Sequence, residues 1–275
     1  MNRFQDWLLV SDMDRSLLDD NKEIPPRNLE ALQYFLSEGG HFTVATGRTP
    51  TSIARYLDIL PLNAPVICNN GSGLYDFQRQ RYTWHLSLDV TAVQTVVDDV
   101  MQRFPHIGVE VYEPERICIP VRNIHTDRHM ELESMGFTEG TYKHPPYTWL
   151  KVVFTQDHSQ LEVLRRHVEA MGYAEQFPSI RFVYSEPQYF ELLSVEGNKG
   201  TGLTMLAKQL GIRPDHTAAL GDNYNDLELI QAAGRGYTVA NAVPELRAIS
   251  CQTVCDNNAG GLADVIQLLE QETTS

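Results

Sequence analysis

The sequence has few cysteines, and their surroundings give no sign of a zinc finger. Only four cysteines occur in 275 residues, and no pair of histidines lies near them at zinc-finger spacing. The short interval between Cys251 and Cys255 is by itself a weak indication of a metal site. We therefore expect four reduced thiols, mostly in the core: Cys68, Cys118, Cys251 and Cys255.

Positive charge is also scarce. The chain carries 22 Lys and Arg against 36 Asp and Glu, which gives a formal net charge of −14. A nucleic-acid binder would need a basic surface, so this balance disfavours that class. It is compatible with an enzyme that concentrates positive charge locally, where an anion must bind.

Long apolar runs are absent. No stretch approaches the roughly 20 apolar residues that span a bilayer, and the first residues do not have the basic-then-apolar pattern of a signal peptide. We find no internal repeat and no low-complexity segment. The expectation is a cytoplasmic protein without a membrane partner, present as a monomer or a homodimer.

What the chain does contain is enough apolar sequence for a folded core. Apolar residues make up 42% and charged residues 21%, and the length suits one large domain or two modest ones. Strands and helices alternate from the start. Strands are predicted at 7–10, 41–45 and 65–68, with helices at 28–37 and 51–60 between them. This alternation is typical of a parallel sheet covered by helices.

The middle of the chain, about 83–190, has a different pattern. We predict helices at 89–104, 127–135 and 160–171 and strands at 108–112, 116–121, 149–155, 180–184 and 189–193. This mixture indicates an inserted α+β domain that interrupts the first pattern. Such insertions beside an active-site edge often act as lids.

The α/β rhythm returns after residue 190. Helices are predicted at 201–210, 227–233, 244–249 and 261–270, and strands at 217–220, 236–239 and 252–254. The predicted fold class is therefore α/β, with a Rossmann-like parallel-sheet core built from 1–82 and 191–275.

Polar residues follow several of the predicted parallel strands. Asp12 and Asp14 end the first strand, Thr46 follows the second, Asn70 the third, and Asp222 a strand near the C-terminus. Ligands bind beyond the carboxyl ends of strands in open α/β sheets, so these groups could converge in one crevice. The alternative for Asp12 and Asp14 is a pair of solvated loop aspartates.

These residue types suit phosphoryl transfer. A carboxylate can attack phosphorus, and a second one can protonate the leaving oxygen and then deprotonate water. Because phosphate and carboxylates are all negative, the site needs cations. Mg²⁺ prefers oxygen ligands, and Lys199 or the hydroxyl of Thr46 could hold phosphoryl oxygens.

The chain resembles the haloacid dehalogenase superfamily of phosphohydrolases, most closely its Cof-type members with a type IIB cap. The segments that carry the resemblance are SDMDRSLL (11–18), VATGR (44–48), ICNNGS (67–72), EGNKGTGL (196–203), GDNYNDLELI (221–230), VANAVPELR (239–247) and NNAGGLADVI (257–266). They occur in the family's order across nearly the whole chain. The resemblance implies that 83–190 is the cap, which selects the substrate.

The resemblance also implies a role for each matching residue. Asp12 would be the nucleophile and a Mg²⁺ ligand, and Asp14 the general acid and base, with its carbonyl on the metal. Asp222 would bind Mg²⁺, and Asp226 would bind Mg²⁺ or orient Lys199. Contacts with the phosphoryl group or the substrate are implied for Met13, Thr46, Gly47, Arg48, Asn70, Lys199 and Asn225.

Structural alternatives remain for several of these residues. Arg48 could form an ion pair instead of a substrate contact, Asn70 could serve a turn, and Thr46 could cap a helix. Asp222 and Asp226 could belong to an Asx turn and a helix cap. The chain departs from the family pattern D-x-D-G-T after Asp14. Arg15 replaces the glycine, and Ser16 replaces the threonine but keeps a hydroxyl.

The predicted function is a Mg²⁺-dependent phosphatase that hydrolyses a small phosphorylated metabolite, a sugar phosphate, through an aspartyl-phosphate on Asp12. One alternative is an activity like that of phosphohexomutases, sucrose-phosphate phosphatases or mannosyl-phosphoglycerate phosphatases. Another is a catalytically weak protein that binds a phosphate ligand. Candidate specificity residues in the cap are Glu113, Arg116, Arg122, His125 and His144.

Overall fold

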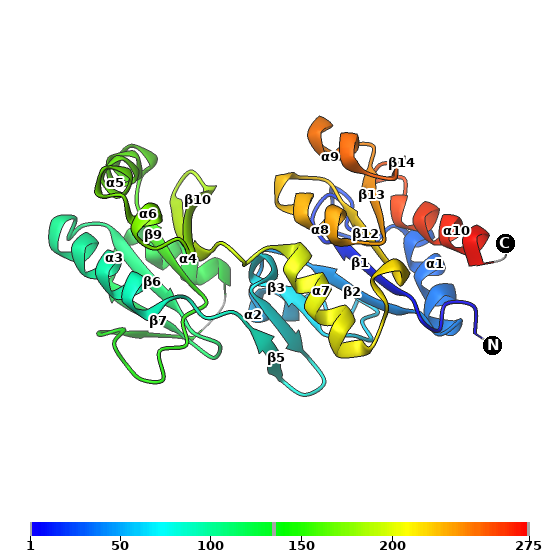
Figure 1. The fold of residues 1–275 in the computed structure, drawn as a ribbon, viewed down its shortest axis with the longest axis horizontal. Coiled ribbons are helices and arrows are strands. Elements are labelled where there is room, and N and C mark those ends of the chain that lie inside the picture. Colours follow the sequence, from blue (N-terminus) through cyan, green and yellow to red (C-terminus); the bar gives the residue numbers. More distant parts are fainter. Residues whose placement is uncertain (1, 134–135, 274–275) are drawn as a thin grey trace. The chain divides into compact units, whose positions relative to one another are not determined.

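The computed structural model describes residues 2–133 and 136–273. These form two compact units, one made of 2–84 and 198–273 and the other of 85–197. The predicted fold class, a parallel-sheet core with an inserted α+β cap domain, is confirmed (Figure 1). In the described part of the chain, no helix has both the length and the apolar character of a membrane span.

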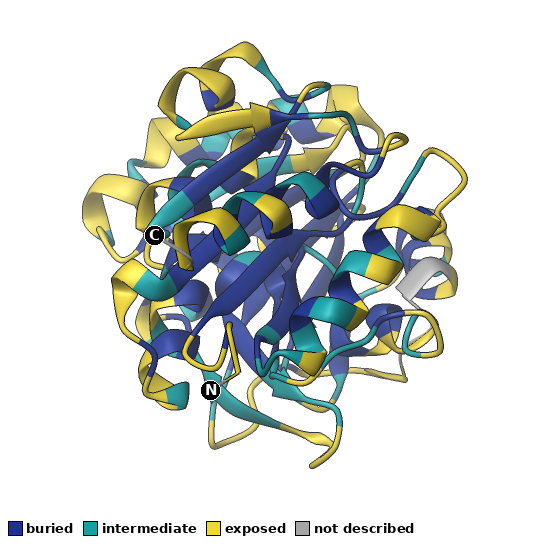
Figure 2. Ribbon diagram, turned by 90° about the vertical axis from the view of Figure 1, so that its right-hand side faces the viewer, coloured by how far each residue is buried: buried dark blue, intermediate teal, exposed yellow. Residues whose placement is uncertain are grey.

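The first unit is built on an eight-stranded sheet. Its strands, in spatial order, are β14 (Gln252–Val254), β13 (Arg235–Val239), β12 (Thr217–Gly221), β1 (Leu8–Asp12), β2 (His41–Ala45), β3 (Val66–Cys68), β4 (Gly73–Asp76) and β5 (Arg81–His85). The strands from β14 to β3 are parallel, and β4 is antiparallel to β3. Figure 2 shows the interior strands in dark blue, beneath helices whose outer faces are exposed.

In the described residues of this unit, six helices and three short 3₁₀ segments accompany the sheet. They are α1 (Pro26–Ser37), α2 (Pro50–Ala54), η1 (Asn69–Gly71), α7 (Lys199–Leu210), η2 (Pro214–His216), η3 (Tyr224–Asp226), α8 (Leu227–Ala232), α9 (Pro244–Ile249) and α10 (Gly261–Thr273). From β1 to β2 and from β12 to β13 the chain moves in opposite directions across the sheet. Right-handed connections therefore place α1 and α8 on opposite faces.

The strand β1 lies at the centre of the sheet because both of its faces are apolar. Leu8, Leu9 and Val10 are fully buried, and burial of each such side chain contributes about 1.5–3 kcal/mol. Pairing in register with β12 on one side and β2 on the other brings three carboxyl ends to one edge of the sheet.

The second unit is a six-stranded sheet with helices. Its strands, in spatial order, are β10 (Ile180–Glu186), β11 (Tyr189–Ser194), β9 (Lys151–Thr155), β6 (Gly108–Tyr112), β7 (Ile117–Val121) and β8 (Phe137–Glu139). Its helices are α3 (Val90–Arg103), α4 (Ile124–Glu133), α5 (His158–Met171) and α6 (Tyr173–Gln176). Apolar faces of α3 and α5 form a separate core with one face of this sheet.

The structure corrects several details of the prediction. The β4–β5 hairpin and the strand β8 were not predicted, and α2 ends at Ala54 instead of residue 60. After Ala54 the backbone forms tighter turns, in which Tyr56 N–H donates to Ile53 C=O. Pro61 then prevents helical continuation. Of the helix predicted at 127–135, residues 134–135 lie outside the described residues.

The predicted domain limits fall inside strands. The limit at 82/83 lies within β5 and the limit at 190/191 within β11, because strand pairing continues past both points. The prediction that the cysteines lie mostly in the core holds for two of them. All four thiols are free, with Cys68 and Cys118 buried, Cys255 partly buried and Cys251 exposed.

Candidate active site

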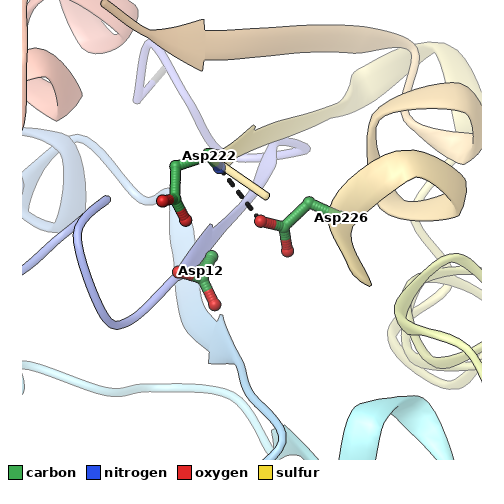
Figure 3. A group of neighbouring side chains, drawn as sticks. All are labelled: Asp12, Asp222 and Asp226. Atoms are coloured by element: carbon green, nitrogen blue, oxygen red, sulfur yellow. Dashed lines mark hydrogen bonds between the residues drawn. The ribbon is translucent and has the colours of Figure 1, made fainter. Parts of the chain in front are cut away.

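The carboxyl ends of the parallel strands in the first unit bring together the residues that the sequence singled out. Asp12 is the last residue of β1 and pairs with Ala45 of β2, so Thr46 follows beside it. Asp222 follows directly after β12. Three carboxylates, those of Asp12, Asp222 and Asp226, offer oxygen atoms within 4.8 Å of one another (Figure 3).

Lys199 joins two of these carboxylates. It is the first residue of α7, and its side chain is fully buried. The helix begins there because Asn198 caps it, with Asn198 Oδ1 accepting from Thr201 N–H at 2.8 Å. Lys199 Nζ donates to Asp12 Oδ1 and to Asp226 Oδ1, each at 2.6 Å. An ammonium has three protons, so one remains for another acceptor.

Asp226 is also fixed by two backbone N–H groups of its own loop. Its Oδ2 accepts from the backbone N–H groups of Asp222 and Asn223 at 3.0 and 3.1 Å, as part of a capping box at η3. Both oxygens of Asp226 therefore already have partners. This geometry favours Asp226 as the residue that orients Lys199.

The cluster fits a divalent cation. Lys199 offsets one of the three buried negative charges, and a divalent cation would offset the other two. The donors are carboxylate oxygens, which Mg²⁺ prefers. Asp12 and Asp222 have the oxygens best able to bind it, since Asp226 is engaged by Lys199 and two amides.

The electrostatics reflect this excess of negative charge. Burial raises the pKa of Asp12 to about 8, with the charges of Asp226 and Asp222 adding to the effect and Lys199 opposing it. Burial and the charge of Asp226 raise the pKa of Asp222 to about 6, against Arg15 and Lys199. For Lys199, burial lowers the pKa, but Asp12 and Asp226 outweigh it and hold the pKa above its usual range.

Asp14 lies in a different environment, outside this carboxylate cluster. Its oxygens accept from Arg48 Nε and a second Arg48 nitrogen, both at 3.0 Å, and from Lys22 Nζ at 2.8 Å. Burial raises the pKa of Asp14, but hydrogen bonds from Arg48 and Lys22 outweigh it and lower the pKa overall. The ion-pair alternative for Arg48 is therefore present in the structure. No sequence pattern indicated the contact of Lys22 with Asp14, which depends on how the loop at 19–25 folds back.

The residues after β2 and β3 form a second cluster of polar groups. Thr46 is buried, and its Oγ1 accepts from Arg48 N–H at 3.2 Å. Gly47 lies against Asn70, whose Oδ1 would be 3.0 Å from a Cβ at that position. Asn225 Nδ2 donates to Asn70 Oδ1 at 3.3 Å. Five positions that the sequence analysis assigned to phosphate or substrate contact are thus connected.

Asn70 also serves a turn, as its structural alternative supposed. Its φ is 52°, within the left-handed region that Asn tolerates better than most residues. Met13 has a fully buried side chain, so only its backbone could meet a phosphate. Helix capping beside Thr46 is done by Thr49, whose side chain accepts from Ser52 N–H.

A model of haloacid dehalogenase-like hydrolases matches residues 9–266 of the chain. The chain belongs to this family. Among related haloacid dehalogenase-like hydrolases, the HMP-PP phosphatase of Serratia proteamaculans is 27% identical over 258 residues, covering 88% of this chain and 86% of that protein. The pyridoxal phosphate phosphatase YbhA of Escherichia coli is 24% identical over 270 residues, covering 94% of this chain and 97% of that protein.

Solved structures of the family share the fold. A haloacid dehalogenase-like hydrolase from Bacteroides thetaiotaomicron superposes with a TM-score of 0.78 at 23% identity, over 96% of this chain and 99% of that one. The subclass IIB sugar phosphatase BT4131 superposes with a TM-score of 0.73 at 14% identity, over 95% and 98%. These comparisons confirm the resemblance, and with it the prediction of a phosphoric monoester hydrolase.

Proposed function

We propose that this haloacid dehalogenase-like hydrolase is a Mg²⁺-dependent phosphatase of a small phosphorylated metabolite, and that the metabolite is a sugar phosphate. The observation that carries the proposal is the fully buried Lys199, held 2.6 Å from both Asp12 and Asp226 beside Asp222. A buried ammonium between carboxylates at a sheet edge is suited to binding a phosphoryl group next to a nucleophile.

Asp12 acts as the nucleophile. One of its oxygens attacks phosphorus, the bond from phosphorus to the leaving oxygen breaks, and an aspartyl-phosphate forms. Lys199 orients Asp12 through Oδ1, which leaves Oδ2 to attack, and directs its remaining proton to a phosphoryl oxygen. Thr46 and the Gly47 amide complete the cradle for the other oxygens. A bound Mg²⁺, held by Asp12 and Asp222, would neutralise negative charge on the phosphoryl group.

Asp14 transfers the protons. In the first step it gives a proton to the leaving oxygen, and in the second it takes one from the water that hydrolyses the aspartyl-phosphate. The contacts of Asp14 with Arg48 and Lys22 favour its ionised form. It must therefore exchange these partners for the substrate oxygen before it can act as an acid. Arg48 and Lys22 thereby set how readily Asp14 gains its first proton.

A small metabolite is supported by the relatives, one of which is named for pyridoxal phosphate and another for HMP-PP. A sugar is supported only by the fold shared with BT4131, a subclass IIB sugar phosphatase. We assign the choice of leaving group to the second unit, 85–197. Of its candidate residues, Arg116 pairs with Glu113, and Arg122 with Asp127 and Glu139. His125 is nearly buried, 3.6 Å from Asp157.

The test is phosphate release from p-nitrophenyl phosphate and from a panel of sugar phosphates, pyridoxal phosphate and nucleotides, each with Mg²⁺ and with excess EDTA. We expect metal-dependent release, fastest with one or two sugar phosphates. Fastest release from pyridoxal phosphate would keep the phosphatase and reject the sugar. Product analysis by NMR would reveal a mutase through an isomeric sugar phosphate in place of free sugar.

The absence of release from any compound would reject the phosphatase. If a sugar phosphate nevertheless raised the melting temperature, the protein would be a binding protein. The hydrogen bonds from Arg48 and Lys22 to Asp14 would then be the first contacts to remove by mutation, because they oppose protonation of the proposed general acid.

A further inference from the structure

We propose that Arg15 weakens the binding of the divalent cation by competing with it for Asp222. This inference rests on the proposed function, since it concerns the same site. Arg15 replaces the glycine of the family pattern, whereas both aspartates of that pattern, Asp12 and Asp14, are retained.

The backbone at Arg15 is held in an unusual conformation. Its φ is 64°, in the left-handed region where an arginine is strained. Two hydrogen bonds close the loop around it, from Leu17 N–H to Asp12 C=O at 3.2 Å and from Leu18 N–H to Met13 C=O at 2.9 Å. Asn241 Nδ2 donates to Arg15 C=O at 2.9 Å. These hydrogen bonds therefore fix the backbone position from which the Arg15 side chain extends.

From that position the guanidinium reaches Asp222. Arg15 Nε lies 3.7 Å from Asp222 Oδ2, and only 6% of the Asp222 side chain is exposed. Ser16 Oγ donates to the other oxygen, Oδ1, at 3.4 Å. Both oxygens of Asp222 therefore have partners from one loop. A divalent cation at this carboxylate must displace or repel a positive charge that a glycine would not supply.

The competition is moderate because Arg15 is partly in water. Its side chain is 61% exposed, so solvent screens its charge. Among the described residues, no arginine forms an ion pair with Asp12, which is bound through Oδ1 by the buried Lys199. Removing the charge at position 15 should therefore tighten Mg²⁺ binding by about threefold, the size expected for an exposed ion pair.

The experiment is a titration of the full-length, substrate-free protein with MgCl₂, followed by calorimetry and by the rise in melting temperature. Arg15→Asn removes the charge and suits a left-handed backbone. Arg15→Lys retains the charge. Arg213→Gln is the matched control, because it removes an exposed arginine that pairs with Asp215 at the opposite, amino end of β12.

We expect the Mg²⁺ dissociation constant of Arg15→Asn to be about one third of the wild-type value, with Arg15→Lys and Arg213→Gln unchanged. An unchanged or larger dissociation constant for Arg15→Asn would overturn this inference alone. Failure of the wild type and of Arg15→Asn to bind Mg²⁺ would overturn the metal dependence under the proposed function as well. Equal tightening in Arg213→Gln would mean that net charge, not Asp222, is responsible.

Discussion

Lys199 Nζ lies 2.6 Å from Asp12 Oδ1 although the two residues are 187 positions apart in the chain. The contact exists because β1 and α7 both end or begin at the carboxyl edge of the same sheet. The buried lysine thus links two carboxylates from distant parts of the first unit, and under the proposed function it also supplies positive charge to a phosphoryl group.

Replacing Lys199 by Met should therefore reduce both stability and activity. Asp12 and Asp226 would stay buried without a cation, which costs about 3–5 kcal/mol of unfolding free energy at pH 7.5. The pKa of Asp12, which Lys199 lowers against the effect of burial, would rise further, so the loss should shrink as the pH falls toward 5 and Asp12 becomes protonated. Urea denaturation at the two pH values measures this. Lys208→Met, an exposed position on the same helix, is the control and should change little.

In the metal-free protein, the ionised carboxylate of Asp222 should lower the free energy of unfolding. Its pKa is raised to about 6 by burial and by Asp226, against about 3.9 for an unfolded Asp. The folded state thus binds the proton more tightly, and ionisation above pH 6 destabilises it. Without metal, the free energy of unfolding of Asp222→Asn should exceed that of the wild type by roughly 1 kcal/mol at pH 7.5. This difference should disappear near pH 4.

The same variant should lose most of its response to metal. Melting curves of wild type and Asp222→Asn, with EDTA and with saturating Mg²⁺, check both effects. Equal Mg²⁺-induced shifts in the two proteins would contradict the assignment of Asp222 as a ligand.

Arg48 should stabilise the ionised form of Asp14. Because hydrogen bonds from Arg48 and Lys22 lower the pKa of Asp14, their stabilisation is present above pH 4 and is lost as the pH falls through the lowered value. The substitution Arg48→Met should lower the free energy of unfolding by about 1 kcal/mol at pH 7. At pH 3.5 the difference between the variant and the wild type should be smaller. Arg213→Met serves as the exposed control, with a change within about 0.5 kcal/mol.

Kinetics of Arg48→Met separate the two roles of this residue. A change in the pH dependence of kcat with an unaltered KM supports the ion pair with Asp14. An increase in KM of more than about tenfold, equivalent to 1.4 kcal/mol, would instead make Arg48 a substrate contact.

Gly71 should be necessary for the approach of η1 to α7. Its φ is 91°, and a Cβ there would lie 1.9 Å from the carbonyl oxygen of Asn198, next to Lys199. We expect Gly71→Ala to lose at least about 2 kcal/mol of unfolding free energy, through both strain and collision. Gly211→Ala is the matched control, with φ 71° but open space around it, and should lose only about 1 kcal/mol. Equal losses would mean that backbone conformation alone matters at Gly71.

The sequence predicted the core of the first unit well because strongly apolar segments leave little choice. Leu8–Val10 of the predicted run and the segment His41–Ala45 lie in strands, Asp12 ends β1, and Asp222 follows β12 as expected. The β4–β5 hairpin was not predicted because its strands are largely half-buried and mix polar with aromatic residues. Such segments have a weak alternating pattern.

Side-chain partners were harder to predict than strands. The motifs indicated that Asp14 and Arg48 lie at the site, with an ion pair as one alternative for Arg48. They did not indicate that Asp14 is the partner of Arg48 or that Lys22 also contacts Asp14. Those contacts depend on loops whose conformation includes positive φ at Arg15 and Lys22, which no local pattern indicates for these residue types. Motif positions therefore identified the candidate residues, and the fold determined their partners.

The most direct measurement of the central claim is phosphate release from p-nitrophenyl phosphate by wild type and by Asp12→Asn, with Mg²⁺ present. Asp215→Asn, an exposed aspartate at the amino end of β12, is the control for loss of one carboxylate. If Asp12 is the nucleophile, the kcat of Asp12→Asn should fall by at least about 10⁴-fold, whereas the control should be unchanged. Release by pure, folded Asp12→Asn within tenfold of wild type would contradict Asp12 as the nucleophile.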